Sequence, residues 1–372
     1  MRYRIFLAVF ACLLAVLTVS TLAAPKKDFS QNENRTLAAF PEVTWESIRS
    51  GEFTRGVSEY LADHFILRDM WVSVKAETEL ALQKRYNNGV YKASDGSLID
   101  AFEADSADRF EENLNTLSAF ERDIAAAYGI ETKIIIAPNS AQINEDKLPR
   151  FAINEDGRAM LARISDTLDG YIDVCRALDD HSSEYLYFRT DHHWTYLGAY
   201  YAYAEYKQAL GEPVTPLEDM EPEYVAGDFF GTTYSRFGLF DKKHGDDIYA
   251  PSAAYTRVVS CERDGNETSS VYFPEMLDKK DKYQYYLAGN NATVRVKTDN
   301  ENGRVLLLIK DSYANSFLPY IAPDYEKIVV EDLRYSYDCM TDVIEDEGVT
   351  DVLVLYNLES FAGDEFIKYL NE

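Results

Sequence analysis

The sequence predicts an α/β fold, namely a doubly wound parallel sheet with helices on both faces and a small antiparallel insertion. Three observations lead to this prediction. Short aliphatic runs alternate along the chain with longer amphipathic segments, as strands and crossover helices do in parallel sheets. The runs are almost wholly apolar, as strands buried on both faces are. Polar residues follow directly after several runs, at the strand ends where such sheets carry functional loops.

The N-terminus carries a segment that predicts export. Arg2 and Arg4 precede twenty uncharged residues, 5–24, a stretch long enough to cross a bilayer as a helix. The flanking arginines would stay in the cytoplasm, so the rest of the chain would face outward. We expect residues 1–24 to be an uncleaved signal anchor, although the small residues at its end also allow a signal peptide and a secreted protein. The polar residues 25–44 are expected to be an irregular tether to a domain spanning residues 45–372.

The composition of the exported part limits its partners and cofactors. Two of the 37 basic residues precede the apolar stretch, so the exported part has 35 basic and 64 acidic residues and a net charge of −29. This charge opposes binding to nucleic acid and to anionic membrane surfaces. Contact with the membrane is therefore expected through the N-terminal helix only. Three cysteines lie outside the apolar stretch without metal-type spacing, so no disulfide framework, no metal and no cofactor are expected.

The pattern of apolar residues places the elements of the domain. Helices are expected over 45–85, 107–128, 155–168, 196–210 and 338–347. Gly129 would end the second of these helices, and Thr195 would cap the fourth. Strands are expected at 90–91, 97–99, 133–137, 171–174, 185–188, 304–309, 328–330 and 352–356. Residues 213–300 lack helical periodicity and are expected to be loops with a small antiparallel insertion.

The run Asp191-His192-His193-Trp194 and the distant Ser312 carry the residue types that acyl transfer needs. A serine nucleophile needs a base to accept its proton, and the base needs a carboxylate to fix its tautomer. Ser312 lies between an apolar strand and a predicted helix, which is the context of a nucleophile whose oxyanion the helix N-terminus stabilises. On its own, Asp311 or Ser312 fits a helix N-cap equally well. The histidine run favours the catalytic interpretation.

The positions within this run predict different roles. In an extended segment Asp191 and His193 project to one side and His192 to the other. We therefore expect Asp191 to orient His193, and His193 to act as the base for the serine. His192 is expected to support the site from behind or to pack, and Trp194 to anchor the core. Strand-end position alone adds four candidate pocket residues, for which a loop cap or a surface role is equally consistent: Asn139, Tyr313, Arg334 and Asn357.

At these residues the chain resembles the DHHW family, named for the motif present here at 191–194, and that family is similar to the SGNH-like acetyltransferases of bacterial alginate export. The resemblance extends to residues 33–37, 40–41, 60–69, 136–139 and 231–235. It implies an SGNH-hydrolase-like sheet and makes residues 45–372 a catalytic domain, with the insertion at about 213–300. Carried over by motif, the catalytic residues are Asp191, His193 and Ser312. The chain departs from those relatives at Ser140, where they tend to have lysine, and at His192, where they have a small residue.

The resemblance implies an extracytoplasmic O-acetyltransferase that acts on a cell-envelope or exported polysaccharide. A multipass membrane acyltransferase would supply the acetyl group, Ser312 would carry it, and a hydroxyl of the glycan would accept it. With water as the acceptor, the same site would be a carbohydrate esterase.

Two other classes of protein stay open. The chain could be a catalytically inert glycan-binding or assembly protein of the envelope, since its 28 tyrosines and three tryptophans suit stacking on sugars. It could also be a metal-dependent enzyme with ligands from Asp191, His192, His193 and His64. We rank the metal hypothesis last, because neighbouring histidines in a strand diverge.

Overall fold

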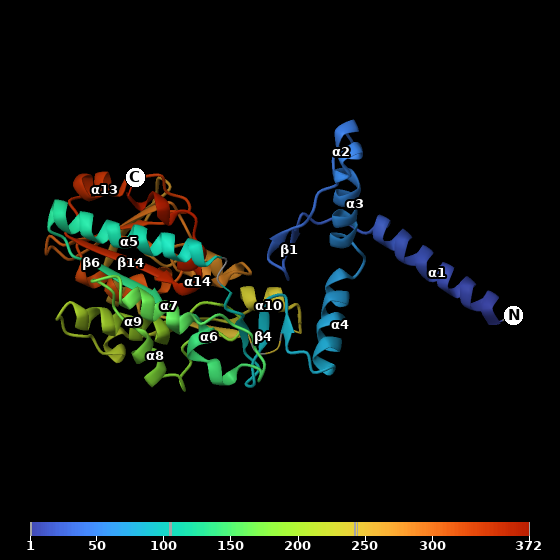
Figure 1. Cartoon of the computed structure of the whole chain (residues 1–372), viewed down its shortest axis with the longest axis horizontal. Coiled ribbons are helices and arrows are strands. Elements are labelled where there is room, and N and C mark those ends of the chain that lie inside the picture. The colour runs from blue at the N-terminus through green and yellow to red at the C-terminus, as the bar shows by residue number, and fades with distance from the viewer. Residues whose placement is uncertain (1, 104–105, 242, 244, 372) are drawn as a thin grey trace. The chain divides into compact units, whose positions relative to one another are not determined.

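The computed structural model describes residues 2–371 apart from 104–105, 242 and 244. The chain divides into two compact units, which are described separately (Figure 1). Unit 1 comprises the residues up to Asn88 together with Tyr234–Asp241, and unit 2 comprises Gly89–Thr233 and Lys242–Glu372. Unit 2 contains the seven-stranded sheet and all the predicted catalytic and pocket residues.

The core of unit 2 is a large mixed sheet of seven strands in the order β10-β9-β11-β13-β12-β14-β6. Four neighbouring strands are parallel, as predicted: β13 (Lys327–Glu331), β12 (Val305–Lys310), β14 (Asp351–Asn357) and β6 (Thr132–Ala137). The other three strands pair antiparallel: β11 (Thr293–Thr298), β9 (Val258–Arg263) and β10 (Asn266–Thr268). The parallel strands are rich in Val, Ile and Leu because both of their faces are buried.

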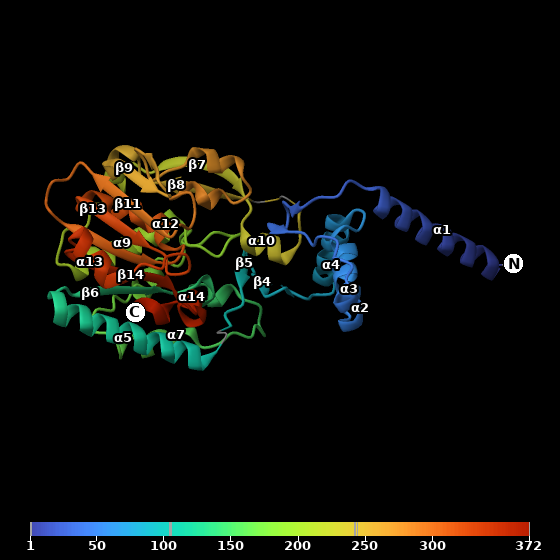
Figure 2. The same cartoon turned by 90° about the horizontal axis from the view of Figure 1, so that it is seen from above.

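Helices cover both faces of this sheet, and each face has its own core. Alternate residues of a strand point to opposite faces, so Ile134 and Ile136 lie in one hydrophobic cluster and Ile135 in the other. The first cluster contains α5 (Ala107–Tyr128), α7 (Gly157–Ser165), α13 (Met340–Glu347) and α14 (Leu358–Gly363). The second contains α8 (Cys175–Asp180), α9 (Tyr196–Ala209) and α12 (Ala314–Ile321). Figures 1 and 2 show α5 and α7 alongside β6 and β14.

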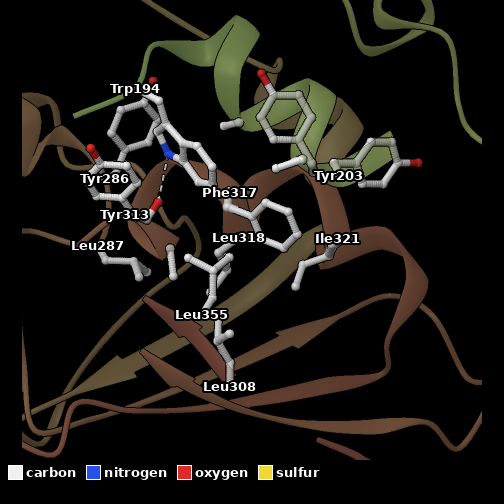
Figure 3. Packing of buried hydrophobic residues seen from close by; sticks show 14 of the residues in the cluster. Trp194, Tyr203, Tyr286, Leu287, Leu308, Tyr313, Phe317, Leu318, Ile321 and Leu355 are labelled. Atoms are coloured by element: carbon white, nitrogen blue, oxygen red, sulfur yellow. Dashed lines mark hydrogen bonds between the residues drawn. The ribbon is translucent and has the colours of Figure 1, made fainter. Parts of the chain in front are cut away.

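The second cluster places the predicted motif against the sheet. Figure 3 shows Trp194 packed with Tyr313 and Phe317 above the strand residues Leu308 and Leu355. Trp194 is fully buried, and its indole N–H donates to the carbonyl of Tyr313 at 3.0 Å. The motif is therefore tied by its tryptophan to the helix that follows Ser312.

Two predicted strands are absent from the described sheets. Residues 171–174 make one isolated bridge, between Tyr171 and Ile134, and residues 185–188 make one, between Tyr187 and Trp194. Both segments are apolar because they are buried in the core. An apolar run indicates that a segment is buried, but it does not show that the segment pairs with a neighbouring strand. The predicted helices at 107–128, 155–168, 196–210 and 338–347 correspond to α5, α7, α9 and α13.

The segment 213–300 contributes more to the fold than a separate insertion would. Its small antiparallel sheet consists of β7 (Glu223–Phe229) and β8 (Asp246–Ala250). Strands β9, β10 and β11 instead extend the central sheet, and short α11 (Ala253–Thr256) precedes them. Unit 2 also contains β4 (Val90–Lys92), which pairs antiparallel with β5 (Leu98–Asp100), and the one-turn α6 (Ser140–Ile143).

Unit 1 is largely helical. It contains α1 (Arg2–Ala23), α2 (Trp45–Ser50), α3 (Glu52–Asp63), α4 (Arg68–Ala81) and β3 (Tyr86–Asn87). Gly51 in a left-handed conformation ends α2, so the predicted helix 45–85 is three helices. The predicted tether 25–44 contains the paired strands β1 (Phe29–Ser30) and β2 (Arg35–Thr36), and Arg35 forms a two-bond ion pair with Asp63 of α3. In the described chain, α1 alone is long and apolar enough to cross a membrane.

Candidate active site

A buried carboxylate, that of Asp246, accepts hydrogen bonds from the loop of residues 189–193 and holds it in place. Asp246, the first residue of β8, accepts the backbone N–H groups of Arg189 and Thr190 at 2.9 and 2.8 Å. The Thr190 hydroxyl and the Tyr185 hydroxyl also donate to Asp246. Burial raises the pKa of Asp246, and these four donors oppose that rise by stabilising the charged form. The loop is a series of bends rather than a strand.

Asp191, His193 and Ser312 form one line of hydrogen bonds. His193 Nδ1 lies 2.5 Å from Asp191 Oδ1, and His193 Nε2 lies 2.7 Å from Ser312 Oγ. An ionised carboxylate only accepts, so Nδ1 carries the ring proton and Nε2 is free to accept from the serine. Asp191 and His193 are 3% and 6% exposed, and Ser312 is half-buried. The three side chains thus have the arrangement that proton abstraction from a serine requires.

The second oxygen of Asp191 is bound by the chain at 231–232. Thr232 donates to Asp191 Oδ2 from its backbone N–H at 2.7 Å and from its hydroxyl at 3.0 Å. A Cβ at Gly231 would lie 2.1 Å from the same oxygen, so the residue here must be glycine for the backbone to approach. Burial would raise the pKa of Asp191, but the adjacent His192 and His193 and these hydrogen bonds hold it well below its usual value. Asp191 is therefore a carboxylate throughout the neutral range.

Ser312 is positioned by the turn between β12 and α12. The buried Asp311 accepts the Tyr313 backbone N–H at 2.8 Å and the Asn357 backbone N–H at 2.9 Å. The Asn357 side chain donates to the same carboxylate, and Asn139 Nδ2 donates to Asn357 Oδ1 at 3.1 Å. The ends of β6, β12 and β14 are thereby joined in one buried network. In the described chain, the backbone N–H of Ser312 has no acceptor.

His193 is held between two rings. Tyr283 stacks on it with ring centroids 3.8 Å apart and an interplanar angle of 14°, and His192 lies 3.9 Å away at 36°. The prediction that neighbouring histidines diverge is wrong, because that rule holds for extended backbone and this loop is bent. His192 Nδ1 is 2.7 Å from the Thr232 hydroxyl. That hydroxyl donates its proton to Asp191, so His192 Nδ1 is the donor. Burial and the neighbouring His193 lower the pKa of His192, which is neutral at pH 7.

The remaining predicted pocket residues differ in their placement. Asn139 and Asn357 lie in the network behind Ser312. Tyr313 is fully buried, and its hydroxyl donates to the carbonyl of His192 at 2.6 Å. The guanidinium of Arg334 forms two hydrogen bonds with the buried Asp332, and its backbone N–H forms a third. Asp332 also pairs with Lys310, and no hydrogen bond between described residues joins Arg334 to Asp191, His193 or Ser312.

Four residues of the site were missed from the sequence: Thr232, Tyr283, Asp246 and Asp311. The segment 231–235 had been singled out through the family resemblance, so a signal existed for Thr232. For Asp311 the sequence predicts only a helix cap. Tyr283 and Asp246 lie in the region without periodicity, and nothing in the sequence connects them with the site.

The grouping required for a metal ion is present in part. Ligand atoms of Asp191, His192 and His193 lie within 4.8 Å of one another. Both ring nitrogens of His193 are already bound, by Asp191 and by Ser312. A metal would therefore have to replace those hydrogen bonds. His64, the fourth predicted ligand, belongs to unit 1, where its Nε2 lies 3.0 Å from the carbonyl of Ala38.

The fold and this site define an α/β protein with a Ser-His-Asp constellation whose serine follows the carboxyl end of a parallel strand and whose histidine and aspartate lie on a bent loop. The chain belongs to the DHHW protein family, whose profile matches residues 88–331. No curated protein matches the chain significantly.

Solved structures with the same fold include a DHHW family protein from Eubacterium siraeum, at 26% identity and a TM-score of 0.64 over 76% of this chain and 95% of that one. PatB1 of Bacillus cereus, solved with a sulfonyl adduct, matches at 18% identity and a TM-score of 0.62, over 76% of this chain and 98% of that one. The O-acetyltransferase domain of Pseudomonas putida AlgJ matches at 13% identity and a TM-score of 0.47, over 74% of this chain and 94% of that one. The predicted membership of the DHHW family is confirmed. The fold is shared with PatB1.

Proposed function

We propose that this protein is an extracytoplasmic O-acetyltransferase or esterase of cell-envelope or exported polysaccharide, built on an SGNH-like doubly wound domain. The observation that carries the proposal is the pair of contacts at His193, 2.5 Å to Asp191 and 2.7 Å to Ser312. Side chains at such distances can pass a proton from the serine to the histidine without rearrangement. The network from Asp246 and Thr232 supports it, because it holds Asp191 and its loop in place.

The first half-reaction forms an acetyl-enzyme. His193 Nε2 accepts the Ser312 proton as Ser312 Oγ attacks the carbonyl carbon of an acetyl donor. The charge of Asp191 stabilises the imidazolium that forms. The oxyanion can accept the Ser312 backbone N–H, near the N-terminal end of α12, where the helix dipole favours negative charge. Collapse of the tetrahedral intermediate expels the donor's leaving group, which takes the proton from His193.

The second half-reaction transfers the acetyl group. A glycan hydroxyl gives its proton to His193 Nε2 and attacks the acetyl carbonyl, and Ser312 leaves with that proton. Water in place of the sugar gives acetate, so the acceptor that reaches the acetyl-enzyme decides between transferase and esterase. In this proposal α1 is an anchor, and a multipass membrane acyltransferase supplies acetyl groups on the outer side.

The test is detection of the acetyl-enzyme. The full chain in detergent is incubated with 4-nitrophenyl acetate, quenched in acid and digested, and the peptide containing Ser312 is weighed by mass spectrometry. We expect an added acetyl group on Ser312 and release of 4-nitrophenol that Ser312→Ala abolishes. Equal release by parent and variant would exclude Ser312 as nucleophile and favour the inert glycan-binding alternative. A sulfonyl fluoride is a second probe, since PatB1 carries a sulfonyl adduct.

A further inference from the structure

Unit 1 exposes a row of large apolar side chains along α4 and at its two ends. The row, called here the α4 stripe, consists of Leu67, Met70, Trp71, Val74 and Leu82, which are 44–77% exposed. Met70, Trp71 and Val74 share one face of the helix, and Leu67 and Leu82 are the residues at its N-cap and C-cap. A single exposed leucine needs no explanation, but a row of five indicates a surface that something covers.

The opposite face of α4 is already used for packing. Ala76 is buried, and Val72 lies against Gly238, where a Cβ would come within 2.8 Å of Val72 Cγ1. Lys75 reaches across to Asn87 with a hydrogen bond of 3.0 Å. The helix is thus apolar on two sides, one facing its own unit and one facing outward. Such a helix needs a second apolar surface to cover its outer side.

The beginning of α4 is fixed to the end of α1. The backbone N–H of Ile66 donates to the hydroxyl of the buried Thr21 at 3.2 Å, and Lys26 donates to the carbonyl of Thr21 at 2.7 Å. Leu67, the first member of the α4 stripe, follows Ile66 directly. If α1 spans the bilayer, its last turn lies at the outer surface. The α4 stripe therefore starts at the level where acyl chains meet headgroups.

The distribution of charge favours this location for unit 1. Residues 25–88 contain nine basic and ten acidic residues, which gives a net charge of −1. Residues 89–372 contain 26 basic and 54 acidic residues, which gives a net charge of −28. A nearly neutral segment approaches a lipid surface without the repulsion that the acidic unit would meet. Trp71 adds an amphipathic ring of the type enriched at membrane–water interfaces. A cavity of about 580 Å³ next to Leu67 and Met70 has a mixed polar and apolar lining that includes Phe29 and Phe65.

We propose that α4 lies in the outer lipid–water interface, with the α4 stripe inserted among the acyl chains. Unit 1 then has two contacts with the membrane, the spanning helix α1 and the interfacial helix α4. This extends the expectation that the protein meets the membrane through its N-terminal helix only. The inference rests on retention of α1, not on the chemistry of Ser312.

The experiment places the full chain in phosphatidylcholine vesicles, with and without bromine at positions 6 and 7 of the acyl chains. Bromine quenches tryptophan only at contact, and the emission of Trp71 is the difference between the parent and Trp71→Phe. We expect brominated lipid to remove at least half of that difference. In the matched control Phe151→Trp, at an exposed site of unit 2, the added emission should persist. Unchanged Trp71 emission, or equal quenching at position 151, would overturn the proposal.

A double substitution separates insertion from accidental proximity. Met70→Glu with Val74→Glu places two charges in the α4 stripe and should abolish quenching of Trp71, while hydrolysis of 4-nitrophenyl acetate is unchanged. Quenching that survives the double substitution overturns the proposal. A second outcome also overturns the proposal: Trp71 is not quenched in pure lipid but crosslinks to a protein in the native membrane. A protein partner would then cover the α4 stripe. N-terminal sequencing of protein from its own membrane must find residues 1–23 present. Their loss would overturn the inference and leave the test of Ser312 unaffected.

Discussion

His193 Nε2 and Ser312 Oγ lie 2.7 Å apart although 119 residues separate them in the sequence. The contact forms because the tryptophan that follows His193 is bonded to the carbonyl of the tyrosine that follows Ser312. The core packing shown in Figure 3 therefore also sets the distance between the proposed base and the proposed nucleophile.

The two adjacent histidines should differ in their contribution to ester hydrolysis. His193→Asn removes the base, and general-base assistance is worth about 10²–10⁴ in rate. His192→Asn should cost about tenfold or less, because one supporting hydrogen bond is worth roughly 1.4 kcal/mol and the asparagine amide can still donate to Thr232. Rates of 4-nitrophenol release from the two variants, with and without EDTA, measure this. An inactive His192→Asn beside an active His193→Asn would reverse the assignment, and loss of parent activity in EDTA would favour a metal site.

Gly231→Ala should inactivate the site without touching a catalytic residue. The new Cβ would fall 2.1 Å from Asp191 Oδ2, so the carboxylate must move and His193 loses its orienting partner. We expect activity near that of Asp191→Asn, measured in the same hydrolysis assay, and a lower melting temperature. If Gly231→Ala hydrolyses the ester as fast as the parent, the backbone at 231–232 can move away from Asp191 without disturbing the site.

Tyr283 should matter through its ring more than through its hydroxyl. Tyr283→Phe keeps the ring stacked on His193 and loses two hydrogen bonds, to Ser312 O and Ser316 Oγ. Tyr283→Leu also removes the stack, which is worth about 0.5–1.5 kcal/mol. Hydrolysis should therefore fall by a further two- to tenfold in the leucine variant relative to phenylalanine. Equal rates for the phenylalanine and leucine variants would contradict the role of the ring.

Stability should fall as the pH rises through the titration of Glu331. Burial raises the pKa of this last residue of β13 to about 7. The unfolded chain releases the proton near pH 4.3, so between these values the native state binds more protons than the unfolded state. The free energy of unfolding then decreases with pH across that window, by at most about 4 kcal/mol. Above pH 7 the loss is complete.

Melting temperatures measured between pH 5 and 8 test this linkage. The parent should lose stability over the window, and Glu331→Gln, which cannot ionise, should lose less. Glu262→Gln, at an exposed position of the same sheet, serves as the matched control and should follow the parent. Parallel curves for parent and Glu331→Gln would show that this carboxyl does not titrate in the window.

The sequence by itself determined the parallel strands and the long helices, and it singled out the three proposed site residues. Runs such as 305–310 and 351–357 are buried on both faces, and their local composition is enough to identify them. Asp191, His193 and Ser312 were identified by chemical type and motif, which need no coordinates. The strands β9 to β11 were not foreseen, because their partly exposed residues give a weak pattern.

Only the tertiary structure decided the surroundings of those residues. The orientation of His192 depends on a bent loop, and the rule of alternating side chains applies only to extended backbone. Thr232, Tyr283 and Asp246 reach the site across 40 to 90 residues of chain, and such contacts arise from packing rather than from local pattern. The α4 stripe is likewise visible only in the fold, because a sequence records which side chains are apolar but not which of them the protein leaves uncovered.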